Sequence, residues 1–140
     1  MEVYRCPGCG LFTGHRTGGP GVPACTRCGG AISEEGEPQQ VSLAALEEAI
    51  RTAPVPLLVE FWSTACDACL RSALVLDAVA HRLSGAAVVL RVNLDESPEA
   101  SEAYRILALP TVILFVRTRE QGRRVGPVTA REIEAWARGG

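Results

Sequence analysis

The sequence has no excess of basic residues and no long apolar run. Its 140 residues include 14 Lys and Arg against 16 Asp and Glu, a formal net charge of -2. Nucleic acids and anionic membrane surfaces select a basic protein face, so we expect neither as a partner. No stretch approaches the roughly 18 apolar residues of a membrane span, and the chain does not open with a basic and then apolar export signal. These absences predict a soluble cytoplasmic protein.

Cysteine, by contrast, is abundant and regularly spaced. All six cysteines fall into C-x-x-C pairs, which are Cys6/Cys9, Cys25/Cys28 and Cys66/Cys69. A reducing compartment keeps structural thiols reduced, so this spacing indicates metal binding or redox chemistry rather than a disulfide framework. Two pairs lie near the N-terminus and one lies far from it. Two separate chemistries are therefore expected.

The first 33 residues are rich in glycine and proline and have almost no helical or strand periodicity. Such a segment buries too little apolar surface to offset its ordering entropy, so something else must hold it. Two C-x-x-C turns of this spacing form the knuckles of a tetrahedral zinc ribbon. We predict structural zinc bound by Cys6, Cys9, Cys25 and Cys28, with iron or two extra redox pairs as the alternatives. His15 is expected to be a solvated loop residue, because four cysteines already fill the coordination shell.

The composition changes after an acidic, Gly- and Pro-containing run. We therefore predict a zinc ribbon at 1–33, a linker at 34–40 and a second domain at 41–140. Apolar patterns in the second domain predict alternating helices and strands. Helices are expected from Leu43 to before Pro54, from the third cysteine pair to Gly85, at 99–106 and from Thr129 through Trp136. Strands are expected at 57–62, 86–92, 111–116 and, more weakly, 123–125.

This alternation predicts an α/β domain whose sheet is covered by helices on both sides, because the strands at 57–62 and 86–92 are apolar on both faces. The first of them leads directly into Cys66 and Cys69, at the start of a helix. The helix dipole and free amide groups would stabilise a thiolate at Cys66. Cys69, one turn later, would be the resolving thiol of a disulfide exchange. A metal role is not expected here, because no further ligands lie nearby.

Five short motifs occur in order and together resemble the thioredoxin family. They are Leu58-Val59-Glu60-Phe61-Trp62, Cys66-x-x-Cys69, Val92-Asn93-Leu94-Asp95, Leu109-Pro110-Thr111 and Val125-Gly126. With the ribbon added, the whole chain resembles the zinc-containing branch often called thioredoxin 2. The resemblance implies a thioredoxin fold, with a central mixed sheet flanked by helices. It also implies a thiol-disulfide oxidoreductase of cell redox homeostasis, which reduces protein disulfides and receives electrons from a reductase.

The resemblance also implies roles for single residues. Pro110 matches the cis-proline that faces the dithiol, and only before proline does a cis peptide bond cost little free energy. Glu60 matches the buried acid that accepts the Cys69 proton. Trp62, Leu109 and Gly126 match positions that contact the substrate. The alternatives are that Trp62 only packs the core, that Pro110 is an ordinary trans residue, and that Glu60 faces solvent.

The immediate site departs from the family's Trp-Cys-Gly-Pro-Cys, because this chain has Ala65-Cys66-Asp67-Ala68-Cys69. Ala65 removes an indole that contacts partners, and Ala68 removes a rigid proline. The carboxylate of Asp67 disfavours a neighbouring thiolate, so a slower nucleophile is expected. These losses leave a second hypothesis open, in which the fold and its ribbon form a protein-binding module with weak or no redox activity.

Overall fold

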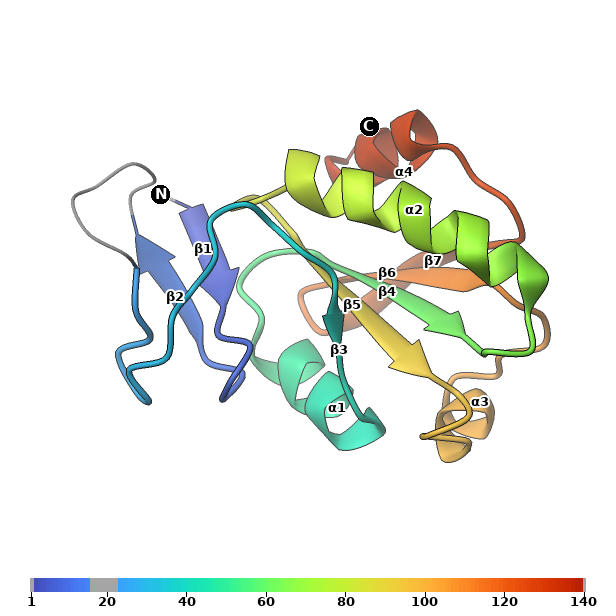
Figure 1. The fold of residues 1–140 in the computed structure, drawn as a ribbon, viewed down its shortest axis with the longest axis horizontal. Coiled ribbons are helices and arrows are strands. Elements are labelled where there is room, and N and C mark those ends of the chain that lie inside the picture. Colours follow the sequence, from blue (N-terminus) through green and yellow to red (C-terminus); the bar gives the residue numbers. More distant parts are fainter. Residues whose placement is uncertain (1, 16–22, 140) are drawn as a thin grey trace.

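A computed structural model describes residues 2–15 and 23–139 of the chain (Figure 1). The strands are β1 Glu2–Arg5, β2 Phe12–His15, β3 Gln39–Gln40, β4 Leu57–Trp62, β5 Val88–Asn93, β6 Thr111–Val116 and β7 Arg119–Val125. The helices are α1 Leu43–Thr52, α2 Asp67–Arg82, α3 Glu99–Ala103 and α4 Ala130–Ala137. In the described residues no helix combines the length and apolar character needed to cross a membrane.

The main sheet has five strands in the order β3-β5-β4-β6-β7. Strands β3, β5 and β4 run parallel, while β6 is antiparallel to β4 and β7 is antiparallel to β6. Helices α2 and α4 cover one face of the sheet, and α1 and α3 lie on the other (Figure 1). This arrangement confirms the predicted mixed sheet flanked by helices.

Alternation along β4 divides the core between the two faces. Leu57, Val59 and Phe61 pack in the cluster that includes residues of α1 and α3. Leu58 packs in the other cluster, with residues of α2 and α4. Glu60 has the same strand parity as Leu58, so the sequence directs this carboxyl group beneath α2.

Side-chain caps fix where two of the helices begin. The Ser42 hydroxyl accepts the amide hydrogen of Ala45 at the start of α1. The Thr129 hydroxyl accepts the amide hydrogen of Glu132 at the start of α4. Each such cap stabilises its helix by about 1 kcal/mol.

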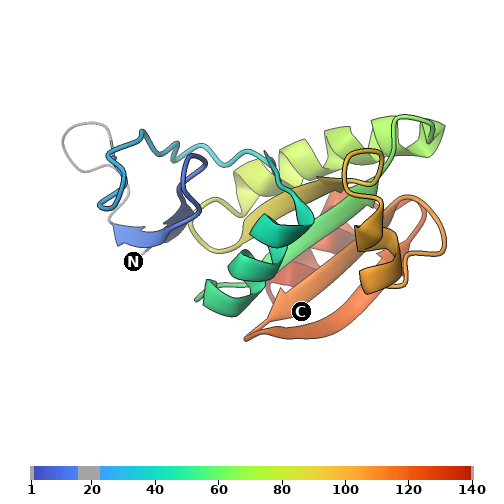
Figure 2. The ribbon, with the colours of Figure 1, turned by 90° about the horizontal axis from the view of Figure 1, so that it is seen from below.

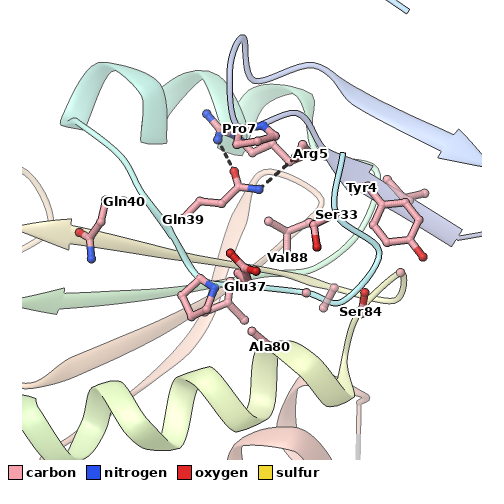
Figure 3. A pocket seen from close by; sticks show the side chains of 16 residues that line it. Tyr4, Arg5, Pro7, Ser33, Glu37, Gln39, Gln40, Ala80, Ser84 and Val88 are labelled. Atoms are coloured by element: carbon pink, nitrogen blue, oxygen red, sulfur yellow. Dashed lines mark hydrogen bonds between the residues drawn. The ribbon is translucent and has the colours of Figure 1, made fainter. Parts of the chain in front are cut away.

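The N-terminal segment contains an antiparallel hairpin of β1 and β2, which was not predicted. The Val3 amide donates to the Gly85 carbonyl at 2.9 Å, which joins the hairpin to the turn after α2. Arg5 and Gln39 exchange two hydrogen bonds across a pocket between β1 and β3 (Figure 3). Strand β3 itself lies within the segment 34–40. The hairpin lies at one end of the molecule's long axis and the start of α2 lies at the other (Figures 1 and 2).

Candidate active site and metal centre

Cys66 and Cys69 lie at the start of α2, after the loop that follows β4. Their sulfur atoms are joined as a disulfide with a Cα–Cα distance of 5.3 Å. Cys66 is the N-cap of α2, and its Sγ accepts the backbone hydrogen of Cys69 at 3.2 Å. Cys66 is half-buried, whereas Cys69 is buried. Amide groups at a helix start stabilise negative charge, so Cys66 is placed to act as a thiolate.

Glu60 is fully buried beneath α2, with no exposed surface. Its Oε1 lies 2.7 Å from Nε of Arg91, the neighbouring residue in register on β5. The hydroxyl of buried Ser72 donates to Oε2. Ser72 follows Cys69 by three residues, so the two side chains share one face of α2. Both carboxylate oxygens therefore have a partner, and the charge of Glu60 is balanced by a guanidinium.

Trp62, the last residue of β4, is partly buried beside this ion pair. The guanidinium of Arg91 stacks on its ring, 4.5 Å from the centroid. Its Nε1 donates to the Gln40 side chain at 3.2 Å. Trp62 thus covers the ion pair and joins β4 to the short edge strand β3.

Of the other three predicted site residues, Leu109 and Pro110 directly precede β6 and Gly126 directly follows β7. The Leu109–Pro110 peptide bond is cis, and Pro110 is buried while Leu109 is half-buried. The Gly126 amide donates to the Pro110 carbonyl at 2.9 Å, which brings these two residues together. Gly126 has φ of 85°, a conformation that favours glycine.

Asp95 holds the loop that leads into Cys66. Its carboxylate accepts hydrogen bonds from the Thr64 hydroxyl, the Thr64 amide and the Ser63 hydroxyl. The hydrogen bonds from Thr64, and then that from Ser63, lower the pKa of Asp95 below its ordinary value of 3.8. The loop before Cys66 is therefore held by a residue that follows β5.

The four N-terminal cysteines form one cluster whose sulfur atoms all lie within 4.8 Å of one another. The Sγ atoms of Cys6 and Cys28 are 3.6 Å apart, and those of Cys9 and Cys25 are 3.5 Å apart. His15 lies in β2 and not in a loop, and its side chain falls outside the described part of the chain. The cluster therefore brings together the four predicted ligands.

The two C-x-x-C turns that hold these sulfurs have the same backbone pattern. The Gly10 amide donates to the Cys6 carbonyl at 2.9 Å, and the Gly29 amide donates to the Cys25 carbonyl at the same distance. Both glycines have positive φ, of 82° and 77°, which a side chain would strain. This repetition turns both cysteine pairs toward a common centre.

Backbone amides and neighbouring sulfurs shift the pKa values of Cys9 and Cys28 in opposite directions. The Leu11 amide lowers the pKa of Cys9 to about 6. The Gly30 amide lowers the pKa of Cys28, but the sulfurs of Cys6 and Cys9 outweigh it and raise that pKa to about 11. Four sulfurs this close oppose one another's ionisation unless a cation is present. The donor set therefore fits Zn²⁺, whose closed structural sites take four thiolates.

Comparison with known proteins shows to which family the chain belongs. The family model described as Thioredoxin matches residues 37–139. The chain belongs to the thioredoxin family. It is similar to the thioredoxin of Synechocystis sp., with 34% identity over 89 residues that cover 64% of this chain and 79% of the relative. Thioredoxin 1 of Nostoc sp. is 33% identical over 89 residues, which cover 64% of this chain and 83% of that protein.

Solved structures of thioredoxins have the same fold. The crystal structure of chloroplastic thioredoxin z gives a TM-score of 0.69 at 29% identity and covers 74% of this chain and 93% of its own. A mutant thioredoxin of Halobacterium salinarum, at 20% identity, gives the same TM-score, which shows the likeness of fold alone. The family match begins at residue 37, so the four-cysteine cluster lies outside it.

The site also contains residues that the sequence analysis assigned no role. Arg91 is the one charged residue in its apolar strand segment, as Glu60 is in the adjacent strand, and that coincidence would have signalled an ion pair. Ser72 gives no comparable signal, because a serine within an amphipathic helix is common. Asp95 was noted only as part of a motif.

Proposed function

We propose that this protein is a thiol-disulfide oxidoreductase that reduces protein disulfides with Cys66 and Cys69. The observation that carries the proposal is the pairing of these two sulfurs at the N-cap of α2. Membership of the thioredoxin family supports it. The same support extends to protein disulfides as substrates, to a cytoplasmic location and to a reductase as electron donor.

The proposed reaction is two successive thiol-disulfide exchanges. The Cys66 thiolate attacks one sulfur of the substrate disulfide, which forms a mixed disulfide and releases the other sulfur as a thiolate that takes up a proton. Cys69 loses its proton and attacks the Cys66 sulfur. The substrate leaves with two thiols, and the protein is left with its own disulfide. Two electrons have passed to the substrate, and a reductase or external dithiol restores them.

The neighbouring residues are proposed to assist these steps. Glu60 would accept the Cys69 proton, since its buried carboxylate lies against Ser72, which shares one face of α2 with Cys69. Pro110 would hold the extended backbone of the substrate beside the dithiol. Trp62, together with Leu109 and Gly126, would border the bound substrate. The last of these has no Cβ and so leaves room for a close backbone approach.

The four-cysteine cluster is proposed to hold a structural zinc ion, as in the zinc-containing branch of the family. Cys6, Cys9, Cys25 and Cys28 supply four thiolates and leave no open position for water or substrate. Cys6 and Cys9 lie between β1 and β2, and this hairpin is at the opposite end of the molecule from the start of α2 (Figures 1 and 2). Zinc would therefore stabilise the ribbon and take no part in disulfide exchange.

A second candidate function is a protein-binding module with weak or no redox activity. It is favoured by Ala65, which is exposed next to Cys66 where the family has an indole. Retention of both cysteines and of the buried Glu60 favours the oxidoreductase. Only the oxidoreductase requires a covalent bond between Cys66 and a partner.

Trapping of mixed disulfides tests this requirement. Cys69→Ser should stop the reaction after the first exchange and leave a disulfide-bearing protein covalently attached to Cys66. The double variant Cys66→Ser/Cys69→Ser is the matched control and should trap nothing. If Cys69→Ser yields no dithiothreitol-sensitive adduct with disulfide-containing proteins, the proposed function is wrong.

A further inference from the structure

Helix α2 exposes two leucines close to the dithiol. Leu70 retains 73% of its surface and Leu74 retains 71%, although both belong to a helix that packs on the sheet. Among the described residues only two other large apolar side chains are exposed, Leu107 at 95% and Val125 at 57%. The packing of this domain therefore does not explain either leucine, and their solvent exposure costs free energy.

The position of the two leucines relates them directly to the nucleophile. Cys66, Leu70 and Leu74 follow one another at intervals of four residues, which places them along one side of α2. The same line continues to Ala78, which is small, and beyond it lies exposed Arg82. The apolar part of the helix surface is therefore confined to the two turns next to Cys66.

We propose that Leu70 and Leu74 form a docking surface for the apolar residues that flank the attacked cysteine of a substrate protein. This inference rests on the proposed function. The occupant follows from the covalent chemistry, because a substrate bonded to the Cys66 sulfur must lie beside the first turns of α2. Water is displaced from both leucines only in that complex. This apolar stripe, formed by Leu70 and Leu74, supplies apolar contact to the substrate from α2, whereas the small side chain of Ala65 supplies little from the preceding loop.

The proposal predicts which disulfides are preferred. A substrate with leucine or phenylalanine beside its cysteine gains apolar contact with the stripe, whereas one with serine or asparagine gains none. Contact made while the mixed disulfide forms raises kcat/KM. The difference between the two kinds of substrate should be about tenfold, which is what partial burial of two leucine side chains supplies.

The test uses the full chain and two synthetic peptides with one disulfide each. The peptides have the same sequence except that leucines flank the disulfide in one and serines in the other. The double variant Leu70→Gln/Leu74→Gln should lose most of the preference for the leucine peptide and reduce the serine peptide at the wild-type rate. Ala78→Gln is the control for position, because it introduces the same polar side chain on the same line one turn beyond Leu74, and it should leave the preference intact.

Each other outcome contradicts a specific statement. If wild-type protein reduces both peptides but does not distinguish them, or if the double variant keeps the preference, the docking surface is wrong and the proposed function stands. If wild-type protein reduces neither peptide nor glutathione disulfide, the proposed function fails. If sedimentation shows a wild-type dimer that the double variant abolishes, the stripe serves self-association and the proposal is overturned.

Discussion

Nε of Arg91 lies 2.7 Å from Oε1 of Glu60, within the sheet and beneath the helix that carries the dithiol. A buried carboxylate is costly unless its charge is balanced and its lone pairs are hydrogen-bonded. Here the guanidinium and the Ser72 hydroxyl meet both needs. The charged group beneath α2 is thus built into the fold.

Removal of Arg91 alone should therefore be strongly destabilising. Arg91→Leu leaves the Glu60 charge buried without a cation to balance it and should lower the free energy of unfolding by about 3 kcal/mol. Urea unfolding followed by far-ultraviolet circular dichroism measures this. Glu60→Leu/Arg91→Leu is the control and should lose clearly less than the single variant. Equal losses in the two variants would show that the ion pair does not carry the effect.

The carboxylate of Asp95 should respond to pH in a defined direction. Hydrogen bonds from Thr64 and Ser63 lower its pKa in the folded protein. Its contribution to stability is therefore complete above the unfolded pKa near 4 and is lost as pH falls through the lower folded value. The stability difference between wild type and Asp95→Ala should be constant at neutral pH and shrink in acid. The carbon resonance of this carboxyl group should titrate below pH 3.8, and a midpoint at or above this value would contradict the loop anchor.

Asp67 should slow the reaction of Cys66 at neutral pH. Its carboxylate, exposed in the first turn of α2, opposes formation of the neighbouring thiolate. Asp67→Asn removes this charge and should make the Cys66 thiolate more abundant, so iodoacetamide should alkylate the reduced protein faster. The increase should be only roughly two- to threefold, because a thiolate that forms more readily is also a weaker nucleophile. The same comparison in urea should show little difference. An unchanged or lower rate in the folded variant would refute the effect.

Removal of metal should loosen the N-terminal segment and leave the remaining domain folded. Structural zinc supplies most of the folding free energy of small ribbons, whereas the five-stranded sheet has its own apolar cores. Native mass spectrometry should find one zinc ion per chain, lost with a strong chelator. Amide exchange should then accelerate at Val3 and Cys6 but stay slow in β4. Unchanged exchange in the ribbon after complete zinc loss would contradict this prediction.

Much of the main domain was predictable from the sequence, because long apolar segments specify their own structure. The run Leu57–Trp62 forms β4 with the expected bounds, and the caps at Ser42 and Thr129 begin the expected helices. Three short strands, β1, β2 and β3, were not predicted. Strand β3 has two residues and exists only through pairing with β5, and the hairpin of β1 and β2 lies in a glycine-rich segment without periodicity.

The pairing of the cysteines could also be predicted, because it too depends on local sequence. A C-x-x-C turn is local, so sequence spacing alone brings two sulfurs together. The contact between Glu60 and Arg91 depends instead on the register of two strands that are 31 residues apart at this point. The exposed apolar stripe of Leu70 and Leu74 likewise depends on what packs against α2, which the helical period alone does not reveal.

Reduction of a protein disulfide by the chain primed with dithiothreitol tests the central claim most directly. The measurement follows loss of the disulfide in a test protein over many turnovers, with dithiothreitol alone as the background. Wild-type protein should accelerate the reaction, and Cys66→Ser, which retains the fold and the ribbon, should bring it back to the background rate. A wild-type rate no faster than that of Cys66→Ser would contradict the oxidoreductase and favour the binding module.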